Sequence, residues 1–416
     1  MRDWIERPLG QLANFQKGRK VDTNDFALDG YAAYLGASGI EGRDDGYGDP
    51  RFGVIAKPVD TLMLWDGERS GLVGFGRNGV VASTVSKLSP SDCLEPKYLY
   101  FSLLAKFDWI QHRRTGTGVP HVPKDLGRIL KVSYPESIVE QQKIAFILST
   151  IDTVIEQAEA LIEKYQHIKA GLMHDLFTRG VLPTGQLRPP RDQAPELYQE
   201  TAIGWIPREW QISSCGQCCV IDTGITLGPH RRPRTNPHGY LRVGNVYRDE
   251  LRLEDITTLE LFSGEIEMAL KKFDLLVVEG HANRAEIGRC AMVQDDAEGL
   301  LFQNHLFRLR AAGLNPVYAL LWMNSHHSQR YWERVCATSS GLNTINSKML
   351  KAMPFFVPTK EEQDRIASAA EKAKSRISGT MAQLDKLRIQ KLGLMQDLLT
   401  GKVAVRVETP APKAVA

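Results

Sequence analysis

Apolar side chains recur between residues 140 and 181 at alternating steps of four and three, the spacing of one buried stripe along a helix. The stretch contains no proline. About 39 residues of continuous helix would be roughly 58 Å long, and such a helix cannot bury its stripe by itself. The pattern therefore predicts a long helix with a helical partner. The stripe consists of Ile144, Leu148, Ile151, Ile155, Ala158, Ile162, Tyr165, Leu172 and Leu176.

The same stretch occurs again 222 residues further along the chain, where Glu140-Gln141 is matched by Glu362-Gln363 without a gap. A repeat of this length indicates that the two copies pack on each other. Two unrelated amphipathic helices, each lying on its own domain, are the alternative. Lys169 and Lys391 interrupt the two stripes at matching positions. The second stripe consists of Ile366, Ala370, Ala373, Ile377, Thr380, Leu384, Leu387, Leu394 and Leu398.

A mixed α/β domain is predicted before the first long helix. Short apolar runs separated by Asp-Gly turns predict strands, and one longer apolar stretch predicts a helix. The strands are expected at 53–56, 61–65, 80–85 and 129–132, and the helix at 96–111.

The first domain begins again after the first long helix. Trp4 and Gly10 are matched by Trp210 and Gly216, and residues 118–135 are matched by residues 341–358. The chain is therefore a tandem duplication. The expected parts are domain 1 at 1–137, a long helix at 138–180, a proline-rich linker at 181–204, domain 2 at 205–358, a second long helix at 359–401 and a disordered tail at 402–416.

Bulk composition narrows the class of protein. The chain has 416 residues, of which 43% are hydrophobic and 24% charged, as is ordinary for a soluble protein of several domains. The N-terminus lacks the apolar segment of a secretion signal, no run is long enough to span a bilayer, and six irregularly spaced cysteines favour a reducing compartment. We therefore expect a cytoplasmic protein. A net charge of only +3 argues against a protein that coats nucleic acid regardless of sequence.

The duplication also serves as a control for candidate chemistry. Cys215, Cys218 and Cys219 resemble part of a metal site, but the first copy has leucine or alanine at the matching positions, so apolar core positions are expected instead. His121 and His305 lack a nucleophile or carboxylate context and are expected to be structural or surface residues. The chain contains no phosphate-binding glycine-lysine loop and no amino-methyltransferase motif. We therefore expect no catalysis, metal or cofactor in this chain.

Three sets of residues carry a resemblance to a known family. Residues 206–210, Ile-Pro-Arg-Glu-Trp, precede Gly216, and residues 240–246 read Tyr-Leu-Arg-Val-Gly-Asn-Val. The two long stretches begin Glu-Gln-Gln-Lys-Ile-Ala and Glu-Gln-Asp-Arg-Ile-Ala and approach their ends with Gly-Leu-Met-x-Asp-Leu. Over nearly its whole length the chain resembles the specificity subunit of Type I restriction-modification systems. It departs from that pattern where domain 1 opens without an Ile-Pro lead-in, and where residues 119–121 differ from residues 342–344.

The resemblance implies an α/β (α+β) architecture with two target-recognition domains. Two long antiparallel helices in a coiled coil would join them, with pseudo-twofold symmetry. Each domain would read one half of a bipartite double-stranded DNA site, and the helix pair would set the spacing. Two methyltransferase subunits would dock on the two equivalent halves and bring S-adenosylmethionine, while motor-nuclease subunits would bring ATP and magnesium. This chain would itself be non-catalytic and bind no cofactor.

Candidate DNA contacts lie in loop-like sequence, where basic and polar side chains could meet phosphates and base edges. In domain 1 they are Lys17, Arg19, Lys20, Arg69, Arg77, Arg113, Arg114, Thr115 and Thr117. In domain 2 they are Arg231, Arg232, Arg234, Asn283, Arg284, Ser339, Ser340 and Asn343.

Two other functions remain open at this point. The chain could be a fused restriction or modification enzyme with a cryptic active site, although the motifs of such enzymes are missing. It could also be a coiled-coil scaffold that binds only proteins, as an antirestriction decoy or an orphan subunit would.

Overall fold

The computed structural model describes residues 4–116, 118–201, 203–339 and 341–406. The chain forms two compact units. Unit 1 comprises residues 1–161 and 380–416, and unit 2 comprises residues 162–379. Each unit therefore contains one globular domain and segments of the same two long helices. Among the described helices, none is both long and apolar enough to cross a lipid bilayer.

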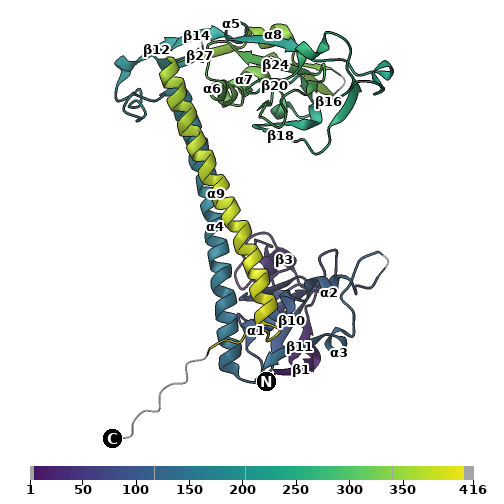
Figure 1. Ribbon diagram of the computed structural model, residues 1–416. Helices are drawn as coiled ribbons and strands as arrows, with labels where there is room; N and C mark the ends of the chain where they lie inside the picture. The colour runs from purple at the N-terminus through teal and green to yellow at the C-terminus, as the bar shows by residue number, and fades with distance from the viewer. Residues whose placement is uncertain (1–3, 117, 202, 340, 407–416) are drawn as a thin grey trace. The chain divides into compact units, whose positions relative to one another are not determined.

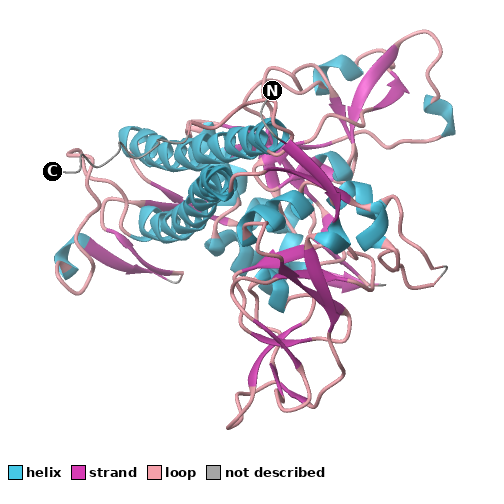
Figure 2. Cartoon of the chain, turned by 90° about the horizontal axis from the view of Figure 1, so that it is seen from below, coloured by secondary structure: helices cyan, strands magenta, loops and turns pink. Residues whose placement is uncertain are grey.

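The two long helices are α4 (Ile138–Thr178) and α9 (Lys360–Leu398), and they lie side by side (Figures 1 and 2). In unit 1, Lys391 Nζ lies 2.6 Å from Asp152 Oδ1, and Arg388 Nη2 lies 2.7 Å from Glu159 Oε1. In unit 2, the guanidinium of Arg376 lies 5.3 Å from the ring centroid of Tyr165. Residue numbers fall along α9 as they rise along α4, so the helices are antiparallel. This confirms the predicted helix pair.

Every position of the two apolar stripes is buried or partly buried. Ile144 and Leu148 share the hydrophobic core of unit 1 with Leu398, and Leu176 shares the core of unit 2 with Ile366. Midway along the helices most stripe positions are only partly buried, as are Ile155, Ile162 and Ile377, whereas Leu384 is buried. The domains therefore cover the ends of the pair most completely. Lys391 interrupts the stripe without being left unpaired, because Asp152 of the other helix neutralises it.

Domain 1 is built on a four-stranded sheet in the order β2-β10-β7-β8. Its central strand β7 (Thr61–Leu64) is buried at every residue, which explains its continuous apolar run. A second sheet has the order β3-β5-β4-β9-β6, and β1 pairs with β11. The other elements are β1 (Trp4–Pro8), β2 (Ala13–Lys17), β3 (Thr23–Asn24), β4 (Ala32–Leu35), β5 (Tyr47–Gly48), β6 (Val54–Ala56), β8 (Val73–Phe75), β9 (Gly79–Val81), β10 (Val85–Pro90), β11 (Lys131–Pro135), α1 (Pro96–Leu104), α2 (Phe107–Gln111) and α3 (Leu126–Ile129).

Three predicted boundaries in domain 1 were wrong. The strand expected at 80–85 is interrupted by a turn, because Thr84 O accepts a hydrogen bond from Trp65 N and Val85 N binds Ala82 O. The helix expected at 96–111 breaks after Leu104, since Ala105 and Lys106 donate to carbonyls that end the first helix. The last strand begins at Lys131, later than expected.

Domain 2 repeats the same core. Its four-stranded sheet has the order β15-β24-β20-β22, in which β20 (Leu275–Val278) is again buried throughout. The other strands of the domain are β14 (Gln211–Ser214), β15 (Cys219–Thr223), β16 (Pro237–Leu241), β17 (Val246–Tyr247), β18 (Glu250–Leu251), β19 (Thr257–Glu260), β21 (Gly280–His281), β22 (Cys290–Met292), β23 (Leu301–Phe302), β24 (Leu306–Ala311), β25 (Ala337–Ser339), β26 (Leu342–Thr344) and β27 (Pro354–Val357). The helices are α5 (Cys215–Cys218), α6 (Pro316–Met323), α7 (His326–Val335) and α8 (Ser347–Ala352).

One buried glutamine fastens each long helix to its domain. The side-chain oxygen of Gln141 accepts a hydrogen bond from Glu95 N, and that of Gln363 accepts one from Asn315 N, both at 2.8 Å. Each amide group also donates to the carbonyl of the proline just before the helix, at 2.9 and 3.0 Å. Glu95 and Asn315 are themselves the N-caps of α1 and α6. The repeated Glu-Gln pair in the sequence therefore marks a repeated joint.

The carboxylate of Glu362 organises the start of α9 in unit 2. It is buried and accepts hydrogen bonds from the guanidinium of Arg188, from Val181 N at 2.9 Å and from Trp210 Nε1 at 3.1 Å. The side chain of Arg188 is only 4% exposed, so its charge depends on this carboxylate and on Glu209, 2.8 Å away. Each charge is thus satisfied by its partner.

The segment expected to be a linker is an ordered part of unit 2. Besides Arg188, it buries Ala194 and Tyr198. Strand β12 (Tyr198–Thr201) pairs with β13 (Gly204–Pro207) as a hairpin. The tail is ordered at its start as well, because Val405 is buried in the core of unit 1. Residues 407–416 lie outside the described residues.

Replacing Glu362 with alanine should lower the free energy of unfolding of the chain by about 3 kcal/mol, because Arg188 would keep a buried charge without its main partner. Denaturant-induced unfolding of both proteins measures the difference. Glu361→Ala is the matched control, since Glu361 is exposed in the same helical turn. An equal, small effect in both variants would contradict the structural role of Glu362.

Candidate nucleic-acid interface

In domain 1, Asp66 joins two of the predicted contact segments. It follows β7, and its carboxylate accepts a hydrogen bond from Lys17 Nζ at 3.0 Å and lies 2.7 Å from His121 Nδ1. His121 is also paired through its backbone with Thr115, with N–O distances of 2.8 and 3.0 Å. Lys17 and the loop at 113–121 therefore meet at the end of β7. His121, which was expected to be a structural or surface residue without a carboxylate nearby, is part of this cluster and lies against Asp66.

Backbone carbonyls hold the two arginines of this loop. Arg114 Nη1 donates to Glu68 O at 2.6 Å, and its Nε donates to Gln111 O at 2.9 Å. Arg113 is exposed, and its guanidinium lies 4.0 Å from the ring centroid of Trp109. These contacts occupy part of each guanidinium and leave positive charge at the surface.

Arg69 and Arg77 meet at a short turn, η2 (Gly39–Glu41). Arg69 Nη1 donates to Glu41 Oε1 at 2.8 Å. Arg77 packs against Gly42, where the backbone φ of +84° favours glycine. Arg19 and Lys20 are exposed next to Lys17. Thr117 lies outside the described residues.

In domain 2, a three-stranded sheet in the order β21-β26-β25 brings Asn283, Arg284, Ser339 and Asn343 into one region. The pairing of Gly280 with Thr344 in this sheet lies within one residue of the position that corresponds to the bridge between Asp66 and His121 in domain 1. Arg284 is exposed and donates to Glu333 O. Of Ser339 only the backbone is described, and Ser340 lies outside the described residues.

Asn343, another predicted contact, is a buried residue whose side chain binds backbone carbonyls. It is 7% exposed, and its side-chain nitrogen donates to His281 O at 3.3 Å and to Ala282 O at 3.0 Å. Its amide group therefore holds the loop that carries Asn283 and Arg284, instead of facing outward as a base-reading side chain would.

Arg231, Arg232 and Arg234 form a separate basic loop. Arg232 and Arg234 are exposed, whereas the Arg231 side chain is 11% exposed and pairs with both carboxylate oxygens of Glu265, at 2.6 and 2.8 Å. Arg231, a predicted DNA contact, is thus bound to a carboxylate of its own domain. A bidentate pair of this kind gives Arg231 a supporting role in the loop.

Sequence reasoning missed the acidic partners of these cations. Asp66, Glu260 and Glu265 hold predicted contact segments in place, and Glu279 lies 2.6 Å from His305 Nδ1. These carboxylates lie 26 or more residues from most of their partners, so no local pattern links them. The duplication offered one signal, because Asp66-Gly67 after β7 and Glu279-Gly280 after β20 stand at corresponding places in the two copies.

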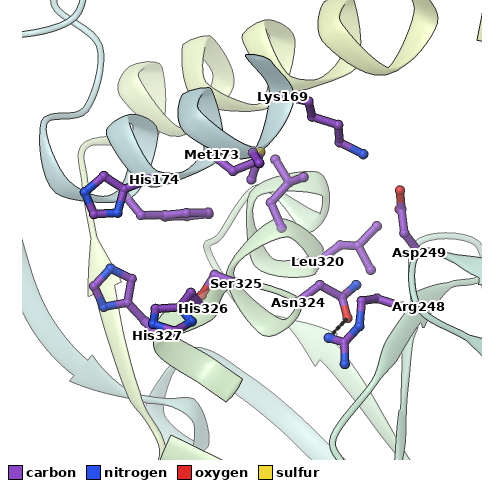
Figure 3. Close-up of a pocket in the computed structure, with 13 residues that line it drawn as sticks. Lys169, Met173, His174, Arg248, Asp249, Leu320, Asn324, Ser325, His326 and His327 are labelled. Atoms are coloured by element: carbon purple, nitrogen blue, oxygen red, sulfur yellow. Dashed lines mark hydrogen bonds between the residues drawn. The ribbon is translucent and has the colours of Figure 1, made fainter. Parts of the chain in front are cut away.

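Unit 2 also contains a cavity of about 540 Å³ between α4 and the helices α6 and α7 (Figure 3). Lys169, His174, Arg248, His326 and His327 contribute its basic and imidazole groups. Apolar side chains line the rest, namely Met173, Phe177, Leu320 and Leu321. Within the described part of the chain, no group of three or more histidine, cysteine or acidic residues could hold a metal ion.

His327 is the most enclosed imidazole in this cavity. Its ring stacks on Trp322, with centroids 5.4 Å apart and planes at 13°. Burial, together with the nearby His174, His326 and Arg330, lowers its pKa to about 4. The imidazole is therefore neutral at pH 7 and behaves as part of the aromatic core.

The three cysteines that resemble part of a metal site in the sequence are core residues, as expected. Cys215, Cys218 and Cys219 are at most 7% exposed and belong to the hydrophobic core of unit 2. Burial contributes to the raised pKa of Cys218 and Cys290. These thiols pack as small apolar side chains.

Comparison with known proteins agrees with this duplicated arrangement. A family model described as the Type I restriction modification DNA specificity domain matches residues 1–164. The MjaVIII specificity subunit of Methanocaldococcus jannaschii is 25% identical over 420 residues, which cover 97% of this chain and 94% of that protein. The chain carries a match to this DNA specificity domain at its start and is similar to a Type I specificity subunit over nearly its whole length.

Two further specificity subunits are also similar to this chain. The StySPI specificity subunit of Salmonella potsdam is 22% identical over 289 residues, covering 68% of this chain and 59% of that protein. The crystal structure of the S subunit from M. genitalium shares the fold, with a TM-score of 0.57, 15% identity, and coverage of 95% of this chain and 96% of that one.

His327→Phe should make the stability of the chain less dependent on pH. The pKa is lowered in the folded state from 6.5 to about 4, so the unfolded chain binds a proton below pH 6.5 that the folded chain resists. Stability is therefore lost as pH falls from about 6.5 towards 4. Between pH 7 and 5 the wild type should lose roughly 1–2 kcal/mol more than the variant.

Urea unfolding at both pH values measures this difference. Phenylalanine keeps the stack on Trp322 without titrating, and His167→Phe on the exposed face of α4 is the control. Equal pH dependence in wild type and His327→Phe would show that the imidazole titrates freely.

Proposed function

We propose that each globular domain reads one half of a bipartite double-stranded DNA site, with the chain acting as the non-catalytic specificity subunit of a Type I restriction-modification complex. The observation that carries the proposal is the repeated core with different loops. Both domains have the same four-stranded order, and both end their central strand at a cluster of polar and basic side chains. A conserved scaffold with variable loops suits two readers of unrelated sequences.

The exposed basic side chains, together with the polar side chain of Asn283, are the proposed phosphate and base contacts. In domain 1 they include Lys17, Arg19, Lys20, Arg69 and Arg113. In domain 2 they include Arg232, Arg234, Asn283 and Arg284. Arg231 and Asn343 would act indirectly, by holding the loops that carry these contacts. Few direct contacts suffice for specificity if phosphate contacts set the register of the domain on the duplex.

The helix pair is proposed to set the distance between half-sites and to dock two methyltransferase subunits. Antiparallel pairing with repeated joints at Gln141 and Gln363 supports two equivalent docking positions. S-adenosylmethionine would then belong to the methyltransferase subunits, and ATP and magnesium to motor-nuclease subunits.

Exchange of residues 205–358 for the corresponding domain of another specificity subunit should change one half of the methylated site and leave the other half intact. The exchanged chain would be assembled with its methyltransferase subunits, and methylated positions mapped by sequencing. A change in both halves would refute independent reading by two domains. If the complex methylates no defined site, a protein-binding scaffold becomes the better account.

Reversing the charge of Arg232 and Arg234 together should weaken DNA binding and make it less dependent on salt. Each lost phosphate contact reduces the slope of log K against log salt concentration by about 1. Binding of the assembled complex to a site-containing duplex at several salt concentrations gives the slope. Lys360→Glu, an exposed charge reversal at the start of α9, should leave it unchanged. An unaltered slope in the double variant would remove this loop from the interface.

A further inference from the structure

Glu260 gathers the basic loop of domain 2 around one carboxylate. It is the last residue of β19 and is 7% exposed. Its oxygens accept hydrogen bonds from Arg234 N at 2.6 Å, Asn236 N at 3.0 Å, Thr235 N at 3.2 Å and Thr235 Oγ1 at 2.5 Å. Three consecutive residues of the loop are thus oriented by a single side chain.

These hydrogen bonds also keep the carboxylate charged. The side chain of Thr235 and the backbone N–H groups of the loop lower the pKa of Glu260 to about 2. Hydrogen bonds to an ionised acceptor are stronger than those to a neutral one, so the loop conformation depends on this charge.

Glu265 fixes the preceding part of the same loop. It binds both terminal nitrogens of the Arg231 guanidinium and accepts a hydrogen bond from Phe262 N at 3.0 Å. The ring of Phe262 stacks with His230, at a centroid distance of 6.3 Å, and lies 4.8 Å from the Arg231 guanidinium carbon. Residues 230 and 231 are thereby held against β19 and the turn that follows it.

This framework leaves the side chains of Arg232 and Arg234 exposed. Neither guanidinium forms an ion pair with any residue that the structure describes. Pro229 precedes the two arginines and Pro233 lies between them, and both prolines further restrict the backbone. The loop is therefore a preorganised support for two unpaired positive charges.

We propose that Glu260 and Glu265 are positioning residues for DNA recognition by domain 2. Their carboxylates hold the loop at 229–236 so that Arg232 and Arg234 face the duplex in a defined register. This inference rests on the proposed DNA-reading function and deepens it by naming acidic residues on which binding depends.

The sign of a mutational effect distinguishes this role from simple electrostatics. Removing a negative charge near a DNA-binding surface should strengthen binding, because the field around phosphates becomes more positive. Loss of positioning should weaken binding, because the two arginines must then be ordered when DNA binds.

The test uses the full chain assembled with its methyltransferase subunits and a duplex that carries its mapped site. Glu260→Gln should bind about tenfold more weakly than wild type. Thr235→Val, which removes one hydrogen bond to Glu260 without changing charge, should weaken binding about threefold. Glu267→Gln is the matched control, since Glu267 is exposed in η6 (Glu265–Met268) and makes no ion pair with a described residue.

Discrimination between half-sites is a second measurement, and a general loss of stability would not affect the two half-sites differently. Duplexes with one half-site scrambled separate the contributions of the two domains. Glu260→Gln and Thr235→Val should lose discrimination at the half-site of domain 2 and keep it at the other half-site. Equal loss at both half-sites would overturn the proposal.

The remaining outcomes separate this inference from the proposed function. If Glu260→Gln and Glu267→Gln both bind as tightly as wild type or more tightly, while reversal of Arg232 and Arg234 weakens binding, the loop contacts DNA and only the positioning role fails. If the reversal of both arginines leaves binding unchanged, the proposed contact by this loop fails, and the positioning role fails with it.

Discussion

Antiparallel pairing of α4 with α9 is the constraint on which the rest of the structure depends. A helix of 41 residues with one apolar stripe is stable only if a partner covers that stripe over much of its length. The pairing is specified by more than apolar contact, because Asp152 and Glu159 of α4 meet Lys391 and Arg388 of α9. Since charged pairs oppose each other only in one alignment, they help to set the register of the two helices.

The two domains repeat the joint to this helix pair and differ in what they place beyond it. Gln141 and Gln363 make the same pair of hydrogen bonds in the two units, each to an N-cap residue and to the carbonyl of a proline. The loops around the central strands are different in length and composition. Duplication has therefore preserved the parts that join helix to domain, while the parts proposed to read DNA have diverged.

The long helices and the duplication could be predicted from the sequence because both are periodic along the chain. The helix stripe has a short period, and the joint recurs with the same residue types. The limits of the strands were less predictable. The turn at 82–84 depends on a hydrogen bond between Trp65 N and Thr84 O, and a run of β-branched residues does not reveal that this turn is present.

The loops that form the candidate interface could be predicted from the sequence, but which of their side chains face outward could not. Basic residues were found from composition, but whether a guanidinium faces outward depends on carboxylates brought near by folding. Glu265 is 34 residues from Arg231, and Asp66 is 55 residues from His121. A local pattern cannot record such pairs. The sequence therefore indicates that Arg231 and Asn343 lie in loops, but it does not reveal that both side chains bind groups of their own domain, or that Glu260 holds the basic loop.

The proposed reading of a two-part site is tested most directly by genome-wide sequencing of methylated adenines in cells with and without this chain, in the presence of the methyltransferase subunits that are proposed to bind it. Reading by two domains held at a set distance predicts one asymmetric motif in two parts, separated by a spacer of constant length, that disappears without the chain. An uninterrupted motif, or a set of methylated sites that does not change, would contradict it.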